Sequence, residues 1–401
     1  MALLRNAVNL LVWIVCVWLL SALNSANYLK SKAFPRTPEA PKSVEVTIVA
    51  VGDLISHQDV QKAALEAENG WASLWEEITP FFMSADLAMA NLETPIAPKA
   101  GKPGIPFCFN GPSALVEALR ETGVSIVFAA NNHMYDQSVN GLAETIDTLL
   151  ANSVLQAGCG MSKEEALAPK IIELKGGIKV AVLARTDLFN NNLNQRPDRP
   201  WVAALDLDVD EKIIRDAHEL ADAVIIGVHW GVEYQAQPSQ RQREAARHLV
   251  AAGADVIVGH HPHVLQAFEW VESGGRRGAV AFSLGNFLSN QDRKYNPSRQ
   301  PLGDGDSRDG AALWVSLRKG PTGELEIDAH AEPIWTDNNC NDYEGGRSAK
   351  RVIRVMSTRP GARGQDMEEL LAKRRAHALL RLNGPSGAAN SLPPDQPAPA
   401  G

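Results

Sequence analysis

The residues of this chain that are best suited to chemistry lie in one short segment, Gly259-His260-His261-Pro262-His263. The segment directly follows a mainly apolar run at 255–258, which predicts a buried strand. Neutral imidazole is available at pH 7, because the unperturbed pKa of histidine is ~6.5, and it is the commonest side-chain metal ligand. Packing alone does not account for three imidazoles at a strand end, and the glycine permits close backbone approach. We therefore expect a metal-centred site built on loops at strand ends.

Other polar side chains follow the predicted strands at the same kind of position. Asp53 follows the first strand, Glu93 follows the second, and His229 follows the strand at 223–228. In α/β sheets, ligands bind beyond the carboxyl ends of the strands, so these side chains should meet at one edge. Six of the ten histidines lie in such segments: His57, His133, His229, His260, His261 and His263.

These side chains offer donor atoms of two chemical kinds. Asp53 and Glu93 carry anionic oxygens, Asn132 carries an amide oxygen, and the histidines carry neutral nitrogens. Such mixed donors suit Mn, Zn or Fe rather than Ca²⁺ or Cu(I). Two such ions ~3.5–4 Å apart can clamp a phosphoryl group and lower the pKa of a bridging water, so we expect two divalent transition metals. The expected metal ligands are Asp53, His57, Glu93, Asn132, His229, His261 and His263.

Four further residues are expected to serve the site without binding metal. His133 is placed to protonate a leaving oxygen as a general acid. His260, Glu233 and Asn286 are expected to support the metal ligands or to contact substrate. Ordinary structural roles stay open for some of these positions: Asp53 can cap the next helix, and Asn286 can serve only its turn.

Apolar strand-like runs alternate with helical patterns between residues 44 and 290. Continuous apolar strands separated by helices predict an α/β fold with a covered sheet. The runs at 311–316 and 324–327 have no helix between them, so part of the sheet is expected to be antiparallel. Residues 289–309 are predicted to form a long loop, and one domain is expected at 44–340. Strands are predicted at 45–51, 86–90, 125–129, 180–184, 223–228, 255–258 and 279–284, and helices at 112–122, 138–152, 210–221, 239–252 and 365–382.

The composition excludes one class of function. The 401 residues are 45% hydrophobic and 21% charged, which is ordinary for a globular protein with a core. The formal net charge is −8, and this argues against a nucleic-acid-binding protein that works by bulk electrostatics.

Residues 1–26 predict export from the cytoplasm. Arg5 precedes an almost wholly apolar stretch at 7–23, which fits a signal peptide. The same stretch is near the lower length limit for a membrane span, so an uncleaved anchor stays open. Residues 27–43 are predicted to be a Pro-rich spacer, and residues 341–401 a C-terminal helix with a disordered tail.

Short motifs occur in a fixed order between residues 45 and 290. They are Gly52-Asp53, Asn91-Leu92-Glu93-Thr94-Pro95, Ala130-Asn131-Asn132-His133, His229-Trp230-Gly231-Val232-Glu233-Tyr234, Gly259-His260-His261-Pro262-His263 and Ser283-Leu284-Gly285-Asn286-Phe287. In this order they resemble the CapA family of poly-γ-glutamate capsule biosynthesis proteins and, less closely, the calcineurin-like metallophosphoesterases. Glu93 stands where the phosphoesterase plan has a Gly-Asp, and His57 follows Asp53 by four residues rather than two.

The resemblance implies a four-layer α/β sandwich with two mixed sheets, like that of the metallo-dependent phosphatases. It also implies an exported or membrane-anchored protein that helps to make or export an extracellular anionic polymer. The implied partners are this polymer or its phosphorylated precursor, and the membrane subunits of a polymer synthase or exporter. Three roles stay open: a metal-dependent phosphoester hydrolase, a non-catalytic membrane-anchored partner of the synthase, and a metalloenzyme that cleaves amide bonds in a γ-glutamyl chain.

Overall fold

The computed structural model describes residues 43–102 and 107–384. One compact unit comprises Val44–Lys319 together with the chain from Leu325 onward. The described part of the other unit is Ser43 and the turn Gly320–Glu324, which is closed by a hydrogen bond of 2.8 Å from the Gly320 N–H to the Glu324 carbonyl. The predicted export segment at 1–26, nearly all of the spacer and the tail from 385 lie outside the described residues. Within the described ranges, no helix is both long and apolar enough to span a bilayer.

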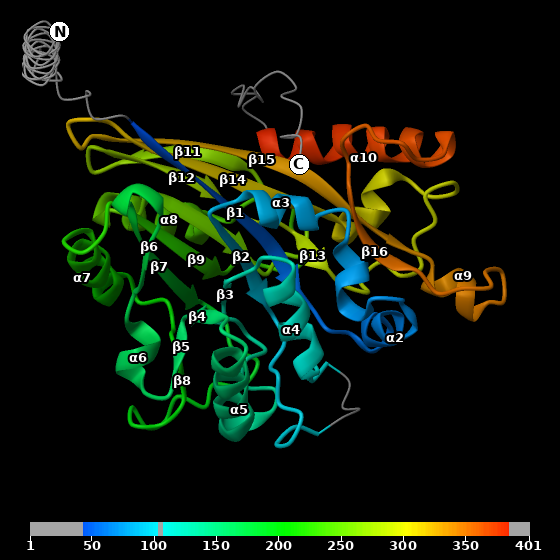
Figure 1. Cartoon of the computed structure of the whole chain (residues 1–401), viewed down its shortest axis with the longest axis horizontal. Helices are drawn as coiled ribbons and strands as arrows, with labels where there is room; N and C mark the ends of the chain where they lie inside the picture. The colour runs from blue at the N-terminus through cyan, green and yellow to red at the C-terminus, as the bar shows by residue number, and fades with distance from the viewer. Residues whose placement is uncertain (1–42, 103–106, 385–401) are drawn as a thin grey trace, which may run out of the picture. The chain divides into compact units, whose positions relative to one another are not determined.

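An eight-stranded mixed sheet forms one half of the compact unit. β1 lies beside β2 and β14, and the short β13 also pairs with β1 (Figure 1). β1 to β4 run parallel, as does β13, whereas β14, β15 and β16 continue the sheet antiparallel. In spatial order the sheet contains β16 (Ile353–Ser357), β15 (Leu325–Asn338), β14 (Asp309–Lys319), β1 (Val44–Leu54), β2 (Leu87–Leu92), β3 (Ile126–Phe128) and β4 (Leu155–Ala157), with β13 (Asn286–Leu288) at the end of β1.

A six-stranded mixed sheet forms the other half. Its four inner strands run parallel, and an antiparallel strand closes each edge. A two-stranded ribbon of β5 (Cys159–Gly160) and β8 (Trp201–Val202) stands apart from both large sheets. In spatial order the six strands are β11 (Phe268–Ser273), β12 (Arg276–Ala281), β10 (Val256–His260), β9 (Ala223–His229), β7 (Lys179–Thr186) and β6 (Lys170–Glu173).

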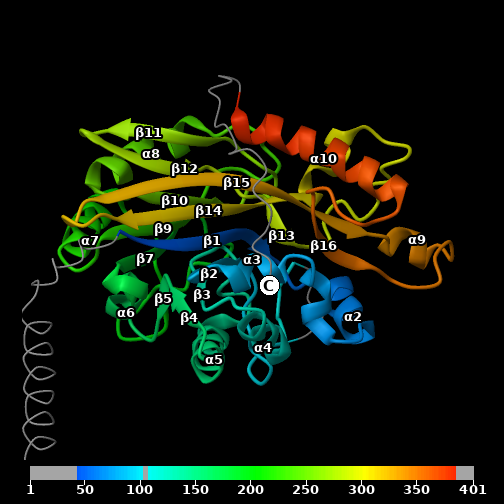
Figure 2. The same cartoon turned by 45° about the horizontal axis from the view of Figure 1, so that its top comes forward.

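The two sheets pack together with helices on their outer faces (Figure 2). Side chains alternate along the strands of the six-stranded sheet: Ile226 and Ile257 belong to a core with α7 and α8, whereas Ile225 and Val258 face the core shared with β1. This confirms the four-layer α/β sandwich with two mixed sheets. The helices are α2 (Gln58–Glu66), α3 (Thr79–Ser84), α4 (Ser113–Glu121), α5 (Ser138–Ala151), α6 (Lys163–Leu167), α7 (Leu207–His218), α8 (Gln240–Ala252), α9 (Cys340–Glu344) and α10 (Gln365–Asn383).

The predicted strands and helices occur at the predicted places, with two differences. The strand predicted at 279–284 ends at Ala281 in β12, because the chain then crosses toward β1 and turns at Gly285, whose φ is 62°. The predicted loop at 289–309 ends in a 3-10 helix, η3 (Leu302–Arg308), whose Leu302 and Gly305 carbonyls accept hydrogen bonds from the Arg374 side chain of α10. A side chain far along the chain therefore stabilises this local structure.

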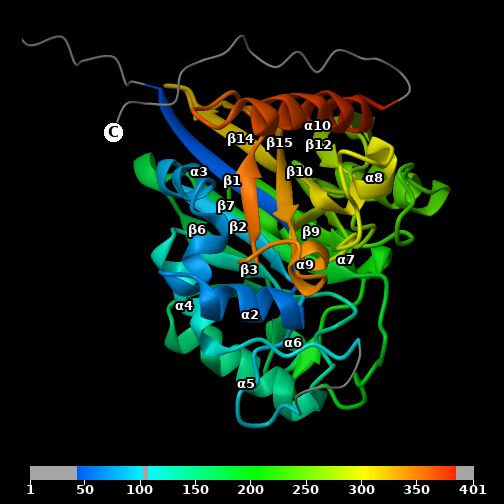
Figure 3. The same cartoon turned by 90° about the vertical axis from the view of Figure 1, so that its right-hand side faces the viewer.

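The compact unit does not end at residue 340. β16 extends the eight-stranded sheet, and α10 packs against β15, β14 and β11 (Figure 3). Arg374 of α10 is fully buried, and its Nε donates a hydrogen bond of 2.9 Å to Asp309 Oδ1. Burial raises the pKa of Asp309 to about 7, and the Arg374 charge opposes that rise. The Arg374–Asp309 pair therefore fixes α10 to the sheet.

We expect Arg374→Met to lower the free energy of unfolding by about 3 kcal/mol, because it leaves the Asp309 carboxylate buried without its cation. Urea denaturation at pH 8 measures the loss. The loss should shrink toward pH 5, because a carboxyl with a raised folded-state pKa is neutral at lower pH. Lys373→Met is the matched control, since the one ion pair of Lys373 within the described residues is with the exposed Glu369, and the change should alter stability by less than about 0.5 kcal/mol. Equal stability of Arg374→Met and the unaltered chain would contradict the anchoring role.

Candidate metal centre

Two glycines allow the strand ends to approach each other. A Cβ on Gly52 would lie 1.9 Å from the Gly285 carbonyl oxygen, and one on Gly259 would lie 2.0 Å from that of Phe282. Asp53 follows Gly52 in β1, and its N–H donates a hydrogen bond of 3.0 Å to the Gly285 carbonyl. The close approach expected at Gly259 is confirmed, and it brings the histidine-rich turn against the end of β1.

The histidine-rich turn has an unusual backbone. His261 and His263 have φ values of 94° and 57°, in the left-handed region that non-glycine residues seldom occupy. The His261 N–H donates to Asp53 Oδ2 at 3.2 Å, and the Tyr234 N–H donates to the Pro262 carbonyl at 2.8 Å. Hydrogen bonds on both sides therefore hold a strained turn in place, which is typical of functional sites.

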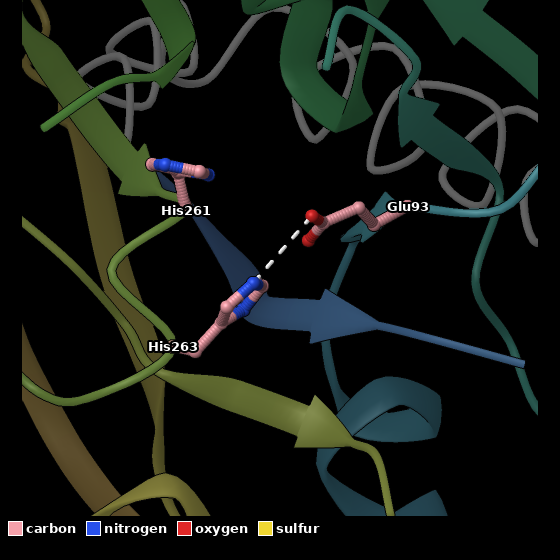
Figure 4. Close-up of side chains that lie close together, drawn as sticks. All are labelled: Glu93, His261 and His263. Atoms are coloured by element: carbon pink, nitrogen blue, oxygen red, sulfur yellow. Dashed lines mark ion pairs between the residues drawn. The ribbon is translucent and has the colours of Figure 1, made fainter. Parts of the chain in front are cut away.

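Carboxylate and imidazole atoms converge on Glu93. One group comprises Asp53, Glu93 and His229, another comprises Glu93, His261 and His263, and within each group the potential ligand atoms lie within 4.8 Å of one another. Glu93 Oε1 is 3.6 Å from His229 Nε2. It is 3.7 Å from His263 Nε2 (Figure 4). Glu93 belongs to both groups, so its carboxylate is the donor that they share.

Asp53 and Glu93 are both fully buried but differ in their surroundings. Burial alone would raise the pKa of Asp53, but hydrogen bonds from His260 and His263 hold it well below its usual value. Asp53 also accepts a hydrogen bond of 2.7 Å from Asn91 Nδ2. Burial raises the pKa of Glu93 well above its usual value, and the Asp53 charge adds to the rise. Neither Glu93 oxygen has a hydrogen-bond partner among the described residues.

Two imidazoles beside Glu93, those of His229 and His261, have lowered pKa values. Burial lowers the pKa of His229 well below its usual value, and burial together with His263 lowers that of His261 to about 4. Nδ1 of each of these two rings has no hydrogen-bond partner within the described chain. A buried carboxylate without donors beside neutral imidazoles is a donor set that fits a divalent transition metal.

Asn132, Asn286 and His260 lie next to these groups. Asn132 Oδ1 is 2.8 Å from His229 Nε2, so the amide oxygen faces the Asp53–Glu93–His229 group. Asn286 Oδ1 is 3.1 Å from His263 Nδ1, and its Nδ2 donates to the Ser307 carbonyl at 2.8 Å. His260 Nδ1 is 3.3 Å from Asp53 Oδ1. Asn286 and His260 therefore support His263 and Asp53.

A cavity of about 460 Å³ opens onto the site. Its wall includes His133, whose Nδ1 is 2.8 Å from Asp136 Oδ2 and whose ring contacts that of Phe109, with centroids 4.3 Å apart and the ring planes tilted by 39°. His57 lies on the same wall but in neither donor group, because its Nδ1 accepts the Asn290 N–H at 3.2 Å. Glu233 is exposed and lines the cavity.

Several site residues were not predicted from the sequence. Asn91 hydrogen-bonds Asp53, Asn190 hydrogen-bonds Asn132 at 3.2 Å, and Asp136 holds His133. Asn91 and Asp136 lie within or just after recognised motifs and could have been found there. Asn190 lies in the long segment after β7, where a run of three asparagines is the only signal.

We expect Glu93→Gln to lower the bound metal per chain by at least half, measured by mass spectrometry after purification without chelator, because it removes the shared carboxylate. After chelation, the unaltered chain should lose thermal stability as the pH rises above the usual carboxyl value of 4.5. The reason is that a carboxyl whose pKa is raised on folding must ionise without a partner as the pH rises. Glu93→Gln should flatten this dependence. Metal content equal to that of the unaltered chain would contradict the assignment of Glu93.

Residues 47–291 match the family described as Bacterial capsule synthesis protein PGA_cap. The chain is 31% identical over 281 residues to the PGA biosynthesis protein CapA of Bacillus subtilis, and the match covers 69% of each chain. It is 29% identical over 294 residues to the capsule biosynthesis protein CapA of Bacillus anthracis, which covers 71% of this chain and 66% of the relative.

One solved structure is also similar. It is a Staphylococcus aureus protein assigned as a 5'-nucleotidase, in complex with alpha-ketoglutarate. The match has 10% identity and a TM-score of 0.44, and it covers 83% of this chain and 58% of the other. That likeness does not bear on the activity.

Proposed function

Because this chain belongs to the bacterial capsule synthesis protein PGA_cap family, we propose that it acts in the biosynthesis or export of an extracellular capsule polymer, with a metal-dependent hydrolase site of phosphoester type. One observation carries the hydrolase assignment: Glu93 is shared by two groups of donor atoms, and both of its buried oxygens lack a hydrogen-bond donor among the residues described. Export to the outer side of the membrane, by a cleaved or retained segment at 1–26, belongs to the same proposal.

The metal would be held by the side chains that converge on Glu93. Asp53 and Glu93 would supply anionic oxygens, and His229, His261 and His263 would supply neutral nitrogens. When bound, one or two Mn, Zn or Fe ions polarise a phosphoryl oxygen and lower the pKa of a coordinated water. The hydrogen bonds to Asp53 keep that carboxylate ionised, and burial keeps the imidazoles neutral, so both stay ready to bind a cation.

His133 is the proposed general acid. Asp136 Oδ2 accepts a hydrogen bond from Nδ1–H of the ring, and the protonated ring would give its Nε2 proton to a leaving oxygen. Phe109 contacts the ring at a tilt of 39° and restricts its movement. His133 is only 8% exposed yet lines the cavity, so it can reach a bound substrate while most of its surface is shielded from water.

The substrate is proposed to be the anionic polymer or its phosphorylated precursor. None of the cavity-lining residues in the described chain is a lysine or arginine, and Glu233 adds a negative charge. An anionic group that enters the cavity therefore depends on the metal for neutralisation. The proposed partners are membrane subunits of a polymer synthase or exporter.

Hydrolysis of bis(p-nitrophenyl) phosphate should require added divalent metal and should fall by at least about 100-fold in Asp53→Ala and His261→Ala. His133→Gln should lower kcat by about 10²-fold or more with metal content unchanged, because loss of a general acid leaves the donor groups intact. His330→Ala on β15 is the control and should leave turnover unchanged. Absence of turnover with Mn, Zn, Fe and Co alike would refute the hydrolase assignment.

A strain that lacks this chain should lose cell-associated capsule polymer, and the unaltered chain should restore it. We expect His261→Ala/His263→Ala to fail to restore it although the variant accumulates normally, as measured by polymer assay and immunoblot. Full restoration by this variant would instead indicate a non-catalytic partner of the synthase.

A further inference from the structure

A second, basic pocket of about 580 Å³ lies beside the loop that follows β13. Its lining includes the cations Lys294, Arg299 and Arg347, and its one carboxylate is Asp342. The formal charge of this lining is therefore +3 − 1 = +2, in a chain whose net charge is −8. The excess of positive charge is confined to this pocket. The cavity at the candidate metal centre, in contrast, is lined by Glu233 and by no lysine or arginine of the described chain.

Two of the cations are free to bind a ligand. Arg347 is occupied, since its Nε donates to Asp342 Oδ1 at 2.8 Å and its Nη2 donates to the Asn341 carbonyl at 3.2 Å. Lys294 and Arg299 are exposed, and neither side chain forms an ion pair or hydrogen bond with any residue in the described ranges. The Asn341 side-chain amide also lines the pocket, and it forms no hydrogen bond with any residue that the structure describes.

The floor of the basic pocket is held by hydrogen bonds. Asn339 Nδ2 donates to Ser348 Oγ and to the Lys350 carbonyl, both at 3.0 Å. Asn339 Oδ1 accepts the Val352 N–H at 2.7 Å. This network joins the segment after β15 to the segment before β16, so the free cations face a fixed wall.

One loop links the basic pocket to the candidate metal centre. Gln291 lines the cavity there and accepts a hydrogen bond of 2.8 Å from Asn286. Lys294 is three residues further on, so its Cα lies within about 11 Å of that of Gln291. A polymer with a negative charge on each repeat unit could thus have one unit in the cavity and the neighbouring units over Lys294 and Arg299.

We propose that the basic pocket binds consecutive carboxylates of an anionic oligomer, one end of which enters the cavity lined by His133 and His263. The identification of the oligomer as the capsule polymer rests on the proposed function, whereas the anion site rests on the pocket itself. Two separated cations with an unpaired amide between loops suit a series of carboxylates better than a single compact anion.

The test is fluorescence anisotropy with the full chain and a fluorescein-labelled decamer of γ-linked glutamate at low salt. Lys294→Ala/Arg299→Ala should weaken binding by about fivefold to thirtyfold and reduce its salt dependence. Arg299→Lys should bind like the unaltered chain. The control Lys212→Ala/Arg215→Ala removes the same charge from the exposed face of α7 and should change the Kd less than twofold. Unchanged binding by Lys294→Ala/Arg299→Ala would overturn the proposal.

Further measurements distinguish the basic pocket from the candidate metal centre and carboxylate from phosphate as the ligand. Phosphoester turnover is measured in parallel on the unaltered chain, so a chain that binds the decamer yet never hydrolyses a phosphoester would retain the basic pocket and lose the proposed activity. Loss of binding in Lys294→Ala/Arg299→Ala with intact phosphoester turnover would support the pocket as a separate site. Displacement of the decamer by polyphosphate of equal charge at a much lower concentration would show that phosphate is the ligand and would overturn the carboxylate assignment.

Discussion

The candidate metal centre depends on one electrostatic constraint: the Glu93 carboxyl is buried and no donor in the described residues faces it. Such a group must take up a proton or lie beside a cation, because an unpaired buried charge is costly. Asp53 is equally buried, yet Asn91, His263 and the His261 N–H satisfy it. The two carboxylates therefore differ in role, since one is fixed by the protein and the other is left for an ion.

The backbone makes this arrangement possible by joining the two sheets at their carboxyl ends. Asp53 lies in β1 of the eight-stranded sheet, and His229 lies in β9 of the six-stranded sheet. Gly52 and Gly259 bring the ends of β1 and β10 against neighbouring carbonyl groups, which no larger residue permits. Both glycines sit inside hydrogen-bonded strands, as do Asp53 and His229, whereas Glu93, His261 and His263 follow directly after strand ends.

Much of the fold and the centre of the site could be predicted, because polar residues directly after apolar strands are conspicuous. Asp53, Glu93 and His229 are such residues, and the structure brings them together. The residues around the donor groups and the C-terminal edge of the sheet were less predictable. His57 is bound by the Asn290 N–H and lies outside the donor groups, a contact between residues 233 positions apart. Asn190 comes from a loop without periodicity, and β16 is a short strand recognisable only by its pairing with β15.

The hydrogen bonds that hold His263 in place continue to residues beyond 47–291, the range that matches the family. Asn286 positions His263 and itself donates a hydrogen bond to the Ser307 carbonyl. Ser307 belongs to the 3-10 helix η3, and Arg374 of α10 donates a hydrogen bond to the Gly305 carbonyl of that helix. The family match ends at residue 291, so Ser307, Gly305 and Arg374 all lie beyond the matched residues. A fragment trimmed to residues 47–291 would therefore lack the contacts that hold Asn286 behind the His263 imidazole.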